Sequence, residues 1–399
     1  MRQSRLGFMF LNIGHFFDHL FLLVFATAAL RLTTEWGMTY AELIPYATPA
    51  FVVFGIGAIP AGWFADKWSR KGMLVVFFIG IGASSILASM ANSPIQMGIC
   101  LAFIGMFAAI YHPVGLAMVV QGLDKTGVPL AINGIFGNMG VASAALLTGY
   151  LVDASGWRSA FIIPGALSIA IGVCYLLFIR GGGDEVPVTH TNGAKAAQTP
   201  TLARSTLLRY FAIILFTTAL GGLVFQSTTF ALPKVFDERL TDIAGTATMI
   251  GWYAFLVFSV AAFAQLVVGY LVDNHSVRTV FATVALLQAV FFFVMTQLTG
   301  VAALLVAIAF MLVVFGQIPI NDVLVGRIAR SEWRSRAYAL RYIVSFSVSA
   351  SAIPLIAWVH GARGFDTLFN ILAVAALAIC AATLFLPGKG QSAPVPTAA

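Results

Sequence analysis

The first candidate for chemistry is a group of ionisable side chains in an apolar run near the N-terminus. The stretch GHFFDHLFLL, residues 14–23, holds His15, Asp18 and His19 among phenylalanines and leucines. Asn12, His15 and His19 recur at steps of three and four residues and Asp18 adjoins them, so a helix would carry them as one polar stripe. A carboxylate beside two imidazoles can take up and release a proton. We therefore predict a proton-coupling site at Asp18, His15 and His19; the alternative is that these side chains only cap or pack helices.

The chain around this stripe is too apolar for a soluble protein. Of its 399 residues, 60% are hydrophobic and 9% are charged, whereas soluble domains carry roughly 25% charged residues. Apolar runs of about 20 residues recur along the sequence, which is the length that a helix needs to cross roughly 30 Å of hydrocarbon. An ionised group at bilayer depth costs about 2.5–3.5 kcal/mol on insertion scales, so such groups are usually functional. The sequence predicts an all-α integral membrane protein.

Charge clusters, glycines, prolines and polar turns divide the chain into twelve expected spans. They fall near 7–30, 44–65, 72–91, 95–119, 128–152, 158–180, 207–231, 245–272, 277–297, 301–325, 336–360 and 365–386. A segment rich in Gly, Thr, Ala and Pro separates the sixth span from the seventh, and this composition is typical of a flexible linker. The expected organisation is a first half over 1–180, a cytoplasmic linker over 181–206, a second half over 207–386 and a disordered cytoplasmic tail over 387–399.

The basic residues predict the orientation of these spans. Of the 22 Lys and Arg residues, Arg31, Arg158, Lys234, Arg239 and Arg363 fall in the expected outer segments, Arg341 lies within a span, and the other sixteen lie in the expected inner segments. This bias predicts that both termini are cytoplasmic, and we expect a bacterial inner membrane. It also accounts for the net charge of +7 without nucleic-acid binding.

Two loops at matching positions indicate an internal repeat and carry a family resemblance. GWFADKWSRKG (62–72) follows the second span, and GYLVDNHSVRT (269–279) follows the eighth, at an offset of 207. Parallel repeats of six spans are common in secondary transporters, whose substrate site lies between the repeats. On these motifs the chain resembles the major facilitator superfamily over essentially its whole length. The matching residues are Gly62, Asp66, Arg70, Lys71 and Gly72, with Gly269, Asp273 and Arg278 in a weaker second copy.

The resemblance implies a conformational role for this loop. Its acid would cap a neighbouring helix, and its basic residues would pair when the outward-facing state forms. The first half also resembles the fosmidomycin-resistance branch of drug exporters, through the His-x-x-Asp pattern at His15 and Asp18 and through YHPVG at 111–115. The antiporter signature of span five pairs a proline with glycines, and here the glycines occur without that proline. The alternative to an antiporter role is that these glycines let helices pack closely.

Further polar residues inside the spans are expected to line a substrate cavity. These are Asn12, His112, Asn133, Gln226, Gln317, Asn321, Asp322 and Arg341. Three interpretations of Arg341 stay open: an ion pair with Asp322, bidentate binding of an anionic substrate, or snorkelling to the cytoplasmic surface. His112 precedes Pro113, whose missing N–H predicts a kink with a polar lining.

These observations predict transport rather than catalysis. The sequence holds no G-x-x-x-x-G-K-[ST] loop for nucleotide binding and no nucleophile or metal constellation, so we expect neither an enzyme nor a cofactor. The expected function is proton-coupled secondary transport by alternating access, with efflux of a small anionic or amphiphilic compound. The alternatives are uptake of an organic anion by proton symport and, remotely, a membrane sensor that moves no solute. We expect a monomer whose partners are the substrate, protons and the lipid bilayer.

Overall fold

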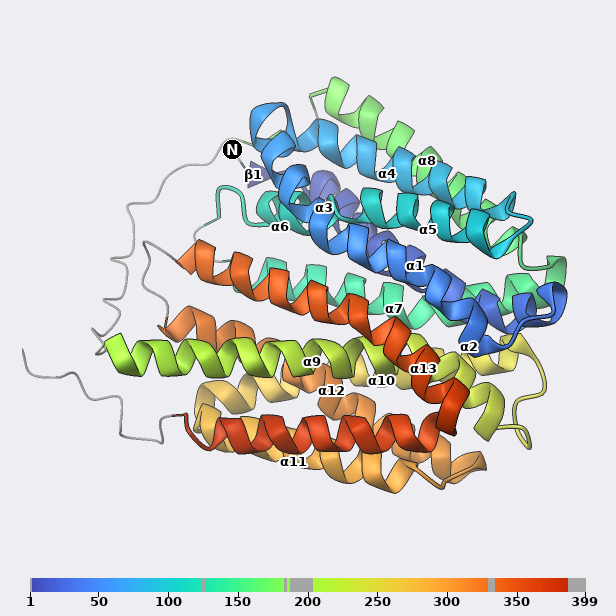
Figure 1. Cartoon of the computed structure of the whole chain (residues 1–399). Coiled ribbons are helices and arrows are strands. Elements are labelled where there is room, and N and C mark those ends of the chain that lie inside the picture. The colour runs from blue at the N-terminus through green and yellow to red at the C-terminus, as the bar shows by residue number, and fades with distance from the viewer. Residues whose placement is uncertain (1, 124–125, 183–184, 187–203, 329–333, 387–399) are drawn as a thin grey trace, which may run out of the picture. The chain divides into compact units, whose positions relative to one another are not determined.

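The computed structural model describes residues 2–123, 126–182, 185–186, 204–328 and 334–386, and helices make up most of these ranges (Figure 1). Two short strands, β1 (Arg2–Gln3) and β2 (Glu185–Val186), pair in antiparallel orientation. Most of the predicted linker, at 183–184 and 187–203, and the predicted tail over 387–399 lie outside the described residues.

The helices follow the predicted spans closely. In chain order they are α1 (Arg5–Trp36), α2 (Tyr40–Leu43), the 3-10 helix η1 (Ile44–Ala47), α3 (Thr48–Lys67), α4 (Arg70–Ser89), α5 (Pro94–Ala108), α6 (Tyr111–Val119), α7 (Gly127–Ser155), α8 (Ser159–Arg180), α9 (Arg204–Arg239), α10 (Ala247–Asn274), α11 (Val277–Met295), α12 (Gly300–Ile328) and α13 (Arg334–Thr383). Side-chain caps mark several starts: Ser69 begins α4 and Ser93 begins α5, each accepting a hydrogen bond from a backbone N–H of the first turn.

Eleven helical segments in the described chain are long and apolar enough to cross a membrane. The last of them, in α13, contains a break at Gly364, whose φ of 72° is a conformation that glycine adopts most readily. The break divides α13 into two spans, which gives twelve in the part of the chain that the structure describes. The predicted all-α membrane fold is thereby confirmed.

Some boundaries differ from those predicted. The seventh span was expected to end at 231, whereas α9 continues to Arg239. Lys234 lies 2.6 Å from Asp237 and 3.5 Å from Glu238 along this last part of the helix. Charged pairs at such spacings support a helix without any apolar signal, so hydropathy alone ends the span too early.

The described residues form two compact units. One contains residues 1–193 and 230–259, and the other contains residues 194–229 and 260–399. In the first unit α1 packs along α7, α4 packs along α8, and α5 contacts α3 and α4; in the second, α11 packs against α12 and α13. The predicted boundaries of the two halves remain a prediction.

Glycines bring α1 and α7 close together, which positions the polar stripe of α1. A Cβ atom placed on Gly140 would lie only 2.2 Å from the backbone oxygen of Phe16. No side chain larger than hydrogen fits there without moving one of the two backbones. The contact holds the face of α1 that carries His15 against the first half of α7.

A break between two short helices positions His112. α5 ends at Ala108 and α6 begins at Tyr111, so Ala109 and Ile110 interrupt the predicted fourth span. Pro113 has no N–H to donate to the carbonyl of Ala109, which is one reason for an interruption at this place. The predicted kink is therefore observed, and it brings the start of α6 beside α1.

Candidate functional site

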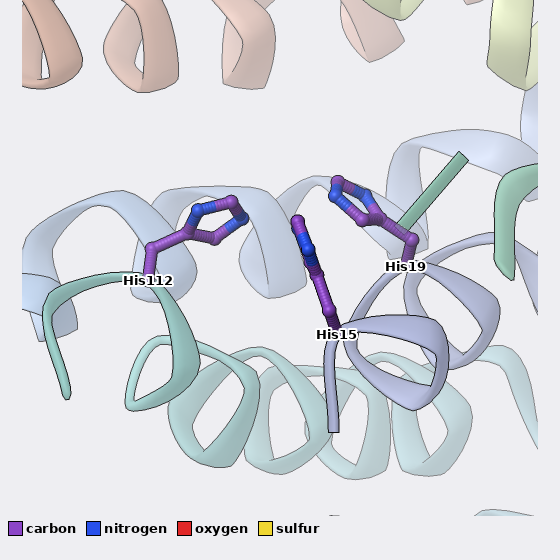
Figure 2. A group of neighbouring side chains, drawn as sticks. All are labelled: His15, His19 and His112. Carbon is purple, nitrogen blue, oxygen red and sulfur yellow. The ribbon is translucent and has the colours of Figure 1, made fainter. Parts of the chain in front are cut away.

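Three imidazoles converge in the first unit (Figure 2). His15 and His19 extend from one face of α1, and His112 extends from the first turn of α6. The ring centroids of His15 and His19 are 5.0 Å apart. The ring centroid of His112 lies 5.4 Å from that of His15 and 5.5 Å from that of His19. One nitrogen from each ring forms a group whose members all lie within 4.8 Å of one another. The sequence placed the first two together by helical spacing, and the fold adds the third.

Asp18 belongs to the same group. Its side chain is 0% exposed, and its Oδ2 atom lies 3.3 Å from Nε2 of His112. A carboxylate and an imidazole at this distance share a proton or form an ion pair, depending on protonation. The contact joins the two elements that carry the four side chains, α1 and α6.

Asn133 on α7 holds this group in place through a network of buried hydrogen bonds. Its backbone oxygen lies 2.8 Å from Nδ1 of His15. Its Nδ2 donates to Oδ1 of Asn12 and to the hydroxyl of Tyr111, both at 2.9 Å. Tyr111 in turn donates to the backbone oxygen of Leu11 at 2.6 Å. Asn12 and Asn133, both predicted to line a cavity, thus lie in a network that joins α1, α6 and α7.

Tyr111 is a residue that sequence reasoning missed. It lies beside the predicted His112 in the YHPVG motif, is fully buried, and stacks on the ring of His15 with centroids 4.9 Å apart and an angle of 20°. Its adjacency to His112 was the available signal. In an isolated sequence, however, a tyrosine inside a membrane span reads as an interfacial residue.

The second unit contains a charged pair inside the predicted spans. Nη1 of Arg341 on α13 donates to Oδ1 of Asp322 on α12. The side chain of Arg341 is 10% exposed and that of Asp322 is 38% exposed. Of the three interpretations of Arg341, the ion pair is the contact present in the structure.

Two further hydrogen bonds extend this polar region along α12. Oγ1 of Thr217 donates to Oδ1 of Asn321 at 3.1 Å, and Nε2 of Gln288 donates to Oε1 of Gln317 at 2.7 Å. Both predicted residues, Gln317 and Asn321, are buried. Gln226 on α9 is buried as well, and its Nε2 has no hydrogen-bond partner among the described residues.

The loop motif is exposed and partly paired. Oδ1 of Asp66 lies 2.8 Å from Nη2 of Arg70, with both side chains exposed. Ser69 caps the start of α4, and the cap that the resemblance implies for Asp66 on a neighbouring helix remains a prediction. A Cβ atom on Gly72 would lie 2.8 Å from the ring of Trp68, so this glycine makes room for the indole.

The other two motif glycines have more open surroundings. Among the described residues, a Cβ atom on Gly62 would meet only Pro113, at 3.5 Å, and one on Gly269 would meet no atom within 4 Å. In the second copy, Asp273 is exposed near the end of α10 and Arg278 is partly buried in the first turn of α11.

Sequence comparison finds relatives among bacterial transporters. The chain is 26% identical over 157 residues to the gallate transporter of Pseudomonas putida, which covers 39% of this chain and 35% of that protein. It is 25% identical over 170 residues to the 4-hydroxybenzoate transporter of the same organism, which covers 40% of this chain and 38% of that protein. The matches thus span well under half the length of these curated relatives.

Comparison of folds finds similar solved structures over nearly the whole chain. A D-xylose-proton symporter superposes with a TM-score of 0.73 at 14% identity, covering 97% of this chain and 99% of that one. A POT family transporter in complex with 5-aminolevulinic acid gives a TM-score of 0.74 at 13% identity, covering 95% and 94%. At such identities the likeness shows the fold alone. The family model for the Major Facilitator Superfamily matches residues 11–245 and 235–399, and the chain belongs to this superfamily of membrane transporters.

Proposed function

We propose that this transporter is a proton-coupled secondary active carrier that takes up a small organic anion by alternating access. The observation that carries the proposal is the burial of Asp18. It is fully covered inside a membrane-spanning helix and lies 3.3 Å from His112. Carboxylates and histidines inside membrane spans are costly, and chains of them are typical of proton relays in transporters. Asp18 is therefore the proposed proton carrier, with His15 and His19 beside it.

Arg341 is the proposed anchor for the anion. Its planar guanidinium can bind a carboxylate through two parallel hydrogen bonds, and Asp322 already presents one carboxylate to it. A substrate carboxylate could take the place of Asp322 with the same geometry. Gallate and 4-hydroxybenzoate, after which two relatives are named, are aromatic carboxylates. Gln317 and Asn321, on the same helix as Asp322, are proposed additional contacts.

The membrane potential opposes entry of an anion, so a coupled proton is needed for uptake more than for export. The interior of a cell is negative, and moving one elementary charge across the membrane is worth about 2.3 kcal/mol per 100 mV. An anion therefore leaves the cell downhill but enters it uphill. A proton-binding site is needed most where the proton must pull the anion inward.

Alternating access requires that proton and substrate bind the inward and outward forms with different affinity. The loops that contain Asp66 with Arg70 and Asp273 with Arg278 are proposed to change their pairing between these forms. We further propose that the carrier is a monomer in a bacterial inner membrane and that both of its termini are cytoplasmic.

Efflux of an anionic or amphiphilic compound is the second candidate. It is favoured by the His-x-x-Asp pattern and the YHPVG motif, through the resemblance to the fosmidomycin-resistance branch. Both candidates use the same residues and differ in the direction of net flux.

Proteoliposomes test the proposed coupling. A pH-sensitive dye reports on the lumen while gallate, 4-hydroxybenzoate, an alkyl sulfonate and an amphiphilic drug are added in turn. We expect at least one carboxylate to acidify the lumen with the wild-type chain, because proton and anion enter together. Asp18→Asn should abolish this signal because an amide does not bind the proton.

Asp242→Asn, an exposed acid between α9 and α10, is the matched control and should behave like wild type. If Asp18→Asn still concentrates substrate against a gradient, the proposed role of Asp18 is wrong. Alkalinisation of the lumen on substrate addition would indicate exchange and favour the efflux candidate.

A further inference from the structure

The group formed by His15, His19 and His112 contains more imidazoles than one proton carrier requires. All three offer a ring nitrogen to the same small volume, and the nitrogens lie within 4.8 Å of one another (Figure 2). Imidazole nitrogens are the commonest protein ligands of transition metals. We propose that these three histidines form a binding site for a divalent transition-metal ion, best suited to Zn²⁺.

The spacing of the ligands fits such an ion after a small adjustment. His15 and His19 are four residues apart on one face of α1, the spacing at which two histidines of a helix can share one zinc ion. Metal–nitrogen bonds of about 2.0–2.1 Å place two ligand nitrogens roughly 3.3 Å apart in a tetrahedral site. The three ring nitrogens lie within 4.8 Å of one another, so rotations about the side-chain bonds would bring them to this distance.

His15 is already oriented as a ligand. The backbone oxygen of Asn133, 2.8 Å from Nδ1, can only accept a hydrogen bond, so the proton of the neutral ring is on Nδ1 and the lone pair is on Nε2. Nε2 is buried and has no hydrogen-bond partner among the described residues. A Cβ atom on residue 137 would lie 2.6 Å from Nε2, so the glycine at that position leaves this nitrogen uncovered. A carbonyl behind a histidine is the usual outer-shell support of a metal ligand.

Asp18 supplies the second support. Its carboxylate lies 3.3 Å from Nε2 of His112, which makes Nδ1 the nitrogen through which His112 would bind. Pairs of carboxylate and histidine of this kind orient the ring and make it a better donor. The carboxylate also offsets part of the charge of a divalent cation at bilayer depth. A site of three imidazoles suits Zn²⁺ and Co²⁺, whereas Mg²⁺ prefers oxygen ligands.

Metal titration of the purified full-length chain tests the site. The protein is prepared in lipid nanodiscs without a polyhistidine tag, and Co²⁺ is added at constant pH while its visible absorption is recorded. We expect one Co²⁺ per chain with an absorption of tetrahedral type, displaced by Zn²⁺ and unaffected by Mg²⁺. His15→Gln and His112→Gln should each weaken Co²⁺ binding at least tenfold, and Asp18→Asn should weaken it about 10- to 100-fold.

The matched control is His275→Gln, which changes an exposed histidine after α10 and should bind Co²⁺ like the wild type. Zn²⁺ should also raise the melting temperature of the wild-type chain, a result that needs no variant to fold. Absence of Co²⁺ absorption in the wild type, or equal affinity in the His15→Gln, His112→Gln and His275→Gln chains, would overturn the proposal. The titration uses neither substrate nor gradient, so its failure leaves the proposed transport function standing.

Discussion

At the scale of single residues, the carboxyl groups of Asp18 and Asp322 have different surroundings. Asp18 lies 3.3 Å from His112, a partner that is charged only when it is protonated. Asp322 faces Arg341, whose charge is permanent. The partner of Asp18 can therefore be neutral or charged, whereas the partner of Asp322 always carries a positive charge. This difference is why we assign the proton to Asp18 and the anion to Arg341.

The role of Arg341 can be separated from its pairing with Asp322 by a double substitution. Arg341→Gln leaves the carboxylate of Asp322 without its guanidinium, so we expect a loss of roughly 1.5–3 kcal/mol in the free energy of unfolding. Adding Asp322→Asn replaces the pair by two neutral amides and should restore most of that stability. It should not restore transport, because no guanidinium remains to bind the anion. Thermal unfolding and substrate uptake in proteoliposomes measure the two effects, and uptake at the wild-type rate by the double variant would contradict the assignment.

At the scale of elements, α7 positions the proposed proton site although it carries none of the proposed titrating groups. Asn133 bonds α1 and α6 to it, and Gly140 lets α1 approach. Sequence reasoning left two roles open for the glycines of this span. The contact at Gly140 agrees with close helix packing.

Two glycines on α7 test this close contact directly. Gly140→Ala places a methyl group against the backbone oxygen of Phe16, 2.2 Å from the Cβ position. The two helices must separate, and overpacking of this kind costs about 1–3 kcal/mol. We expect a lower melting temperature and weaker transport, because separating the helices would stretch the hydrogen bond between His15 and Asn133. Gly134→Ala is the control, because no described atom lies within 4 Å of its Cβ position; equal melting temperatures for the two variants would argue against the packing role.

At the scale of the whole molecule, the two sequence repeats have diverged at their polar positions. By the offset of 208 that aligns residues 131–157 with 339–365, Asn133 of the first repeat corresponds to Arg341 of the second. Asn133 joins helices through hydrogen bonds, whereas Arg341 is in an ion pair. By the offset of 207 that relates the two loop motifs, Asp18 corresponds to Phe225, so the buried acid has no acidic counterpart. The repeats therefore support a division of work, with proton binding in one and anion binding in the other.

The orientation of the chain in the membrane is a prediction from the distribution of its basic residues, and it is directly testable. In a variant whose three cysteines are replaced by serine, single cysteines are introduced by Asp242→Cys and His275→Cys, both at exposed positions. A membrane-impermeant maleimide added to intact cells should label residue 242 and not residue 275, because the loop before α10 is expected outside and the loop after it inside. Labelling of residue 275 alone would reverse the predicted orientation.

The sequence alone determined those features that depend on neighbours along the chain. Twelve spans follow from hydropathy because a helix must provide about 20 apolar residues to cross the hydrocarbon core. The stripe of His15 and His19 follows from helical spacing, and the signature loop at 62–72 follows from its residues. Local charge pairs such as Lys234 with Asp237 carry no hydropathy signal, so the end of α9 was placed too early.

Only the tertiary structure decided which distant residues meet. Asn133 bonds His15 from 118 residues away, and Tyr111 bonds Leu11 across 100 residues. These contacts depend on how closely α1, α6 and α7 approach, and that distance is set by glycines such as Gly140 and by the break before Tyr111. Helical spacing along α1 places only two histidines together, and two histidines alone do not predict a metal site. The third proposed ligand, His112, is on α6, which only the packing of the helices places beside α1.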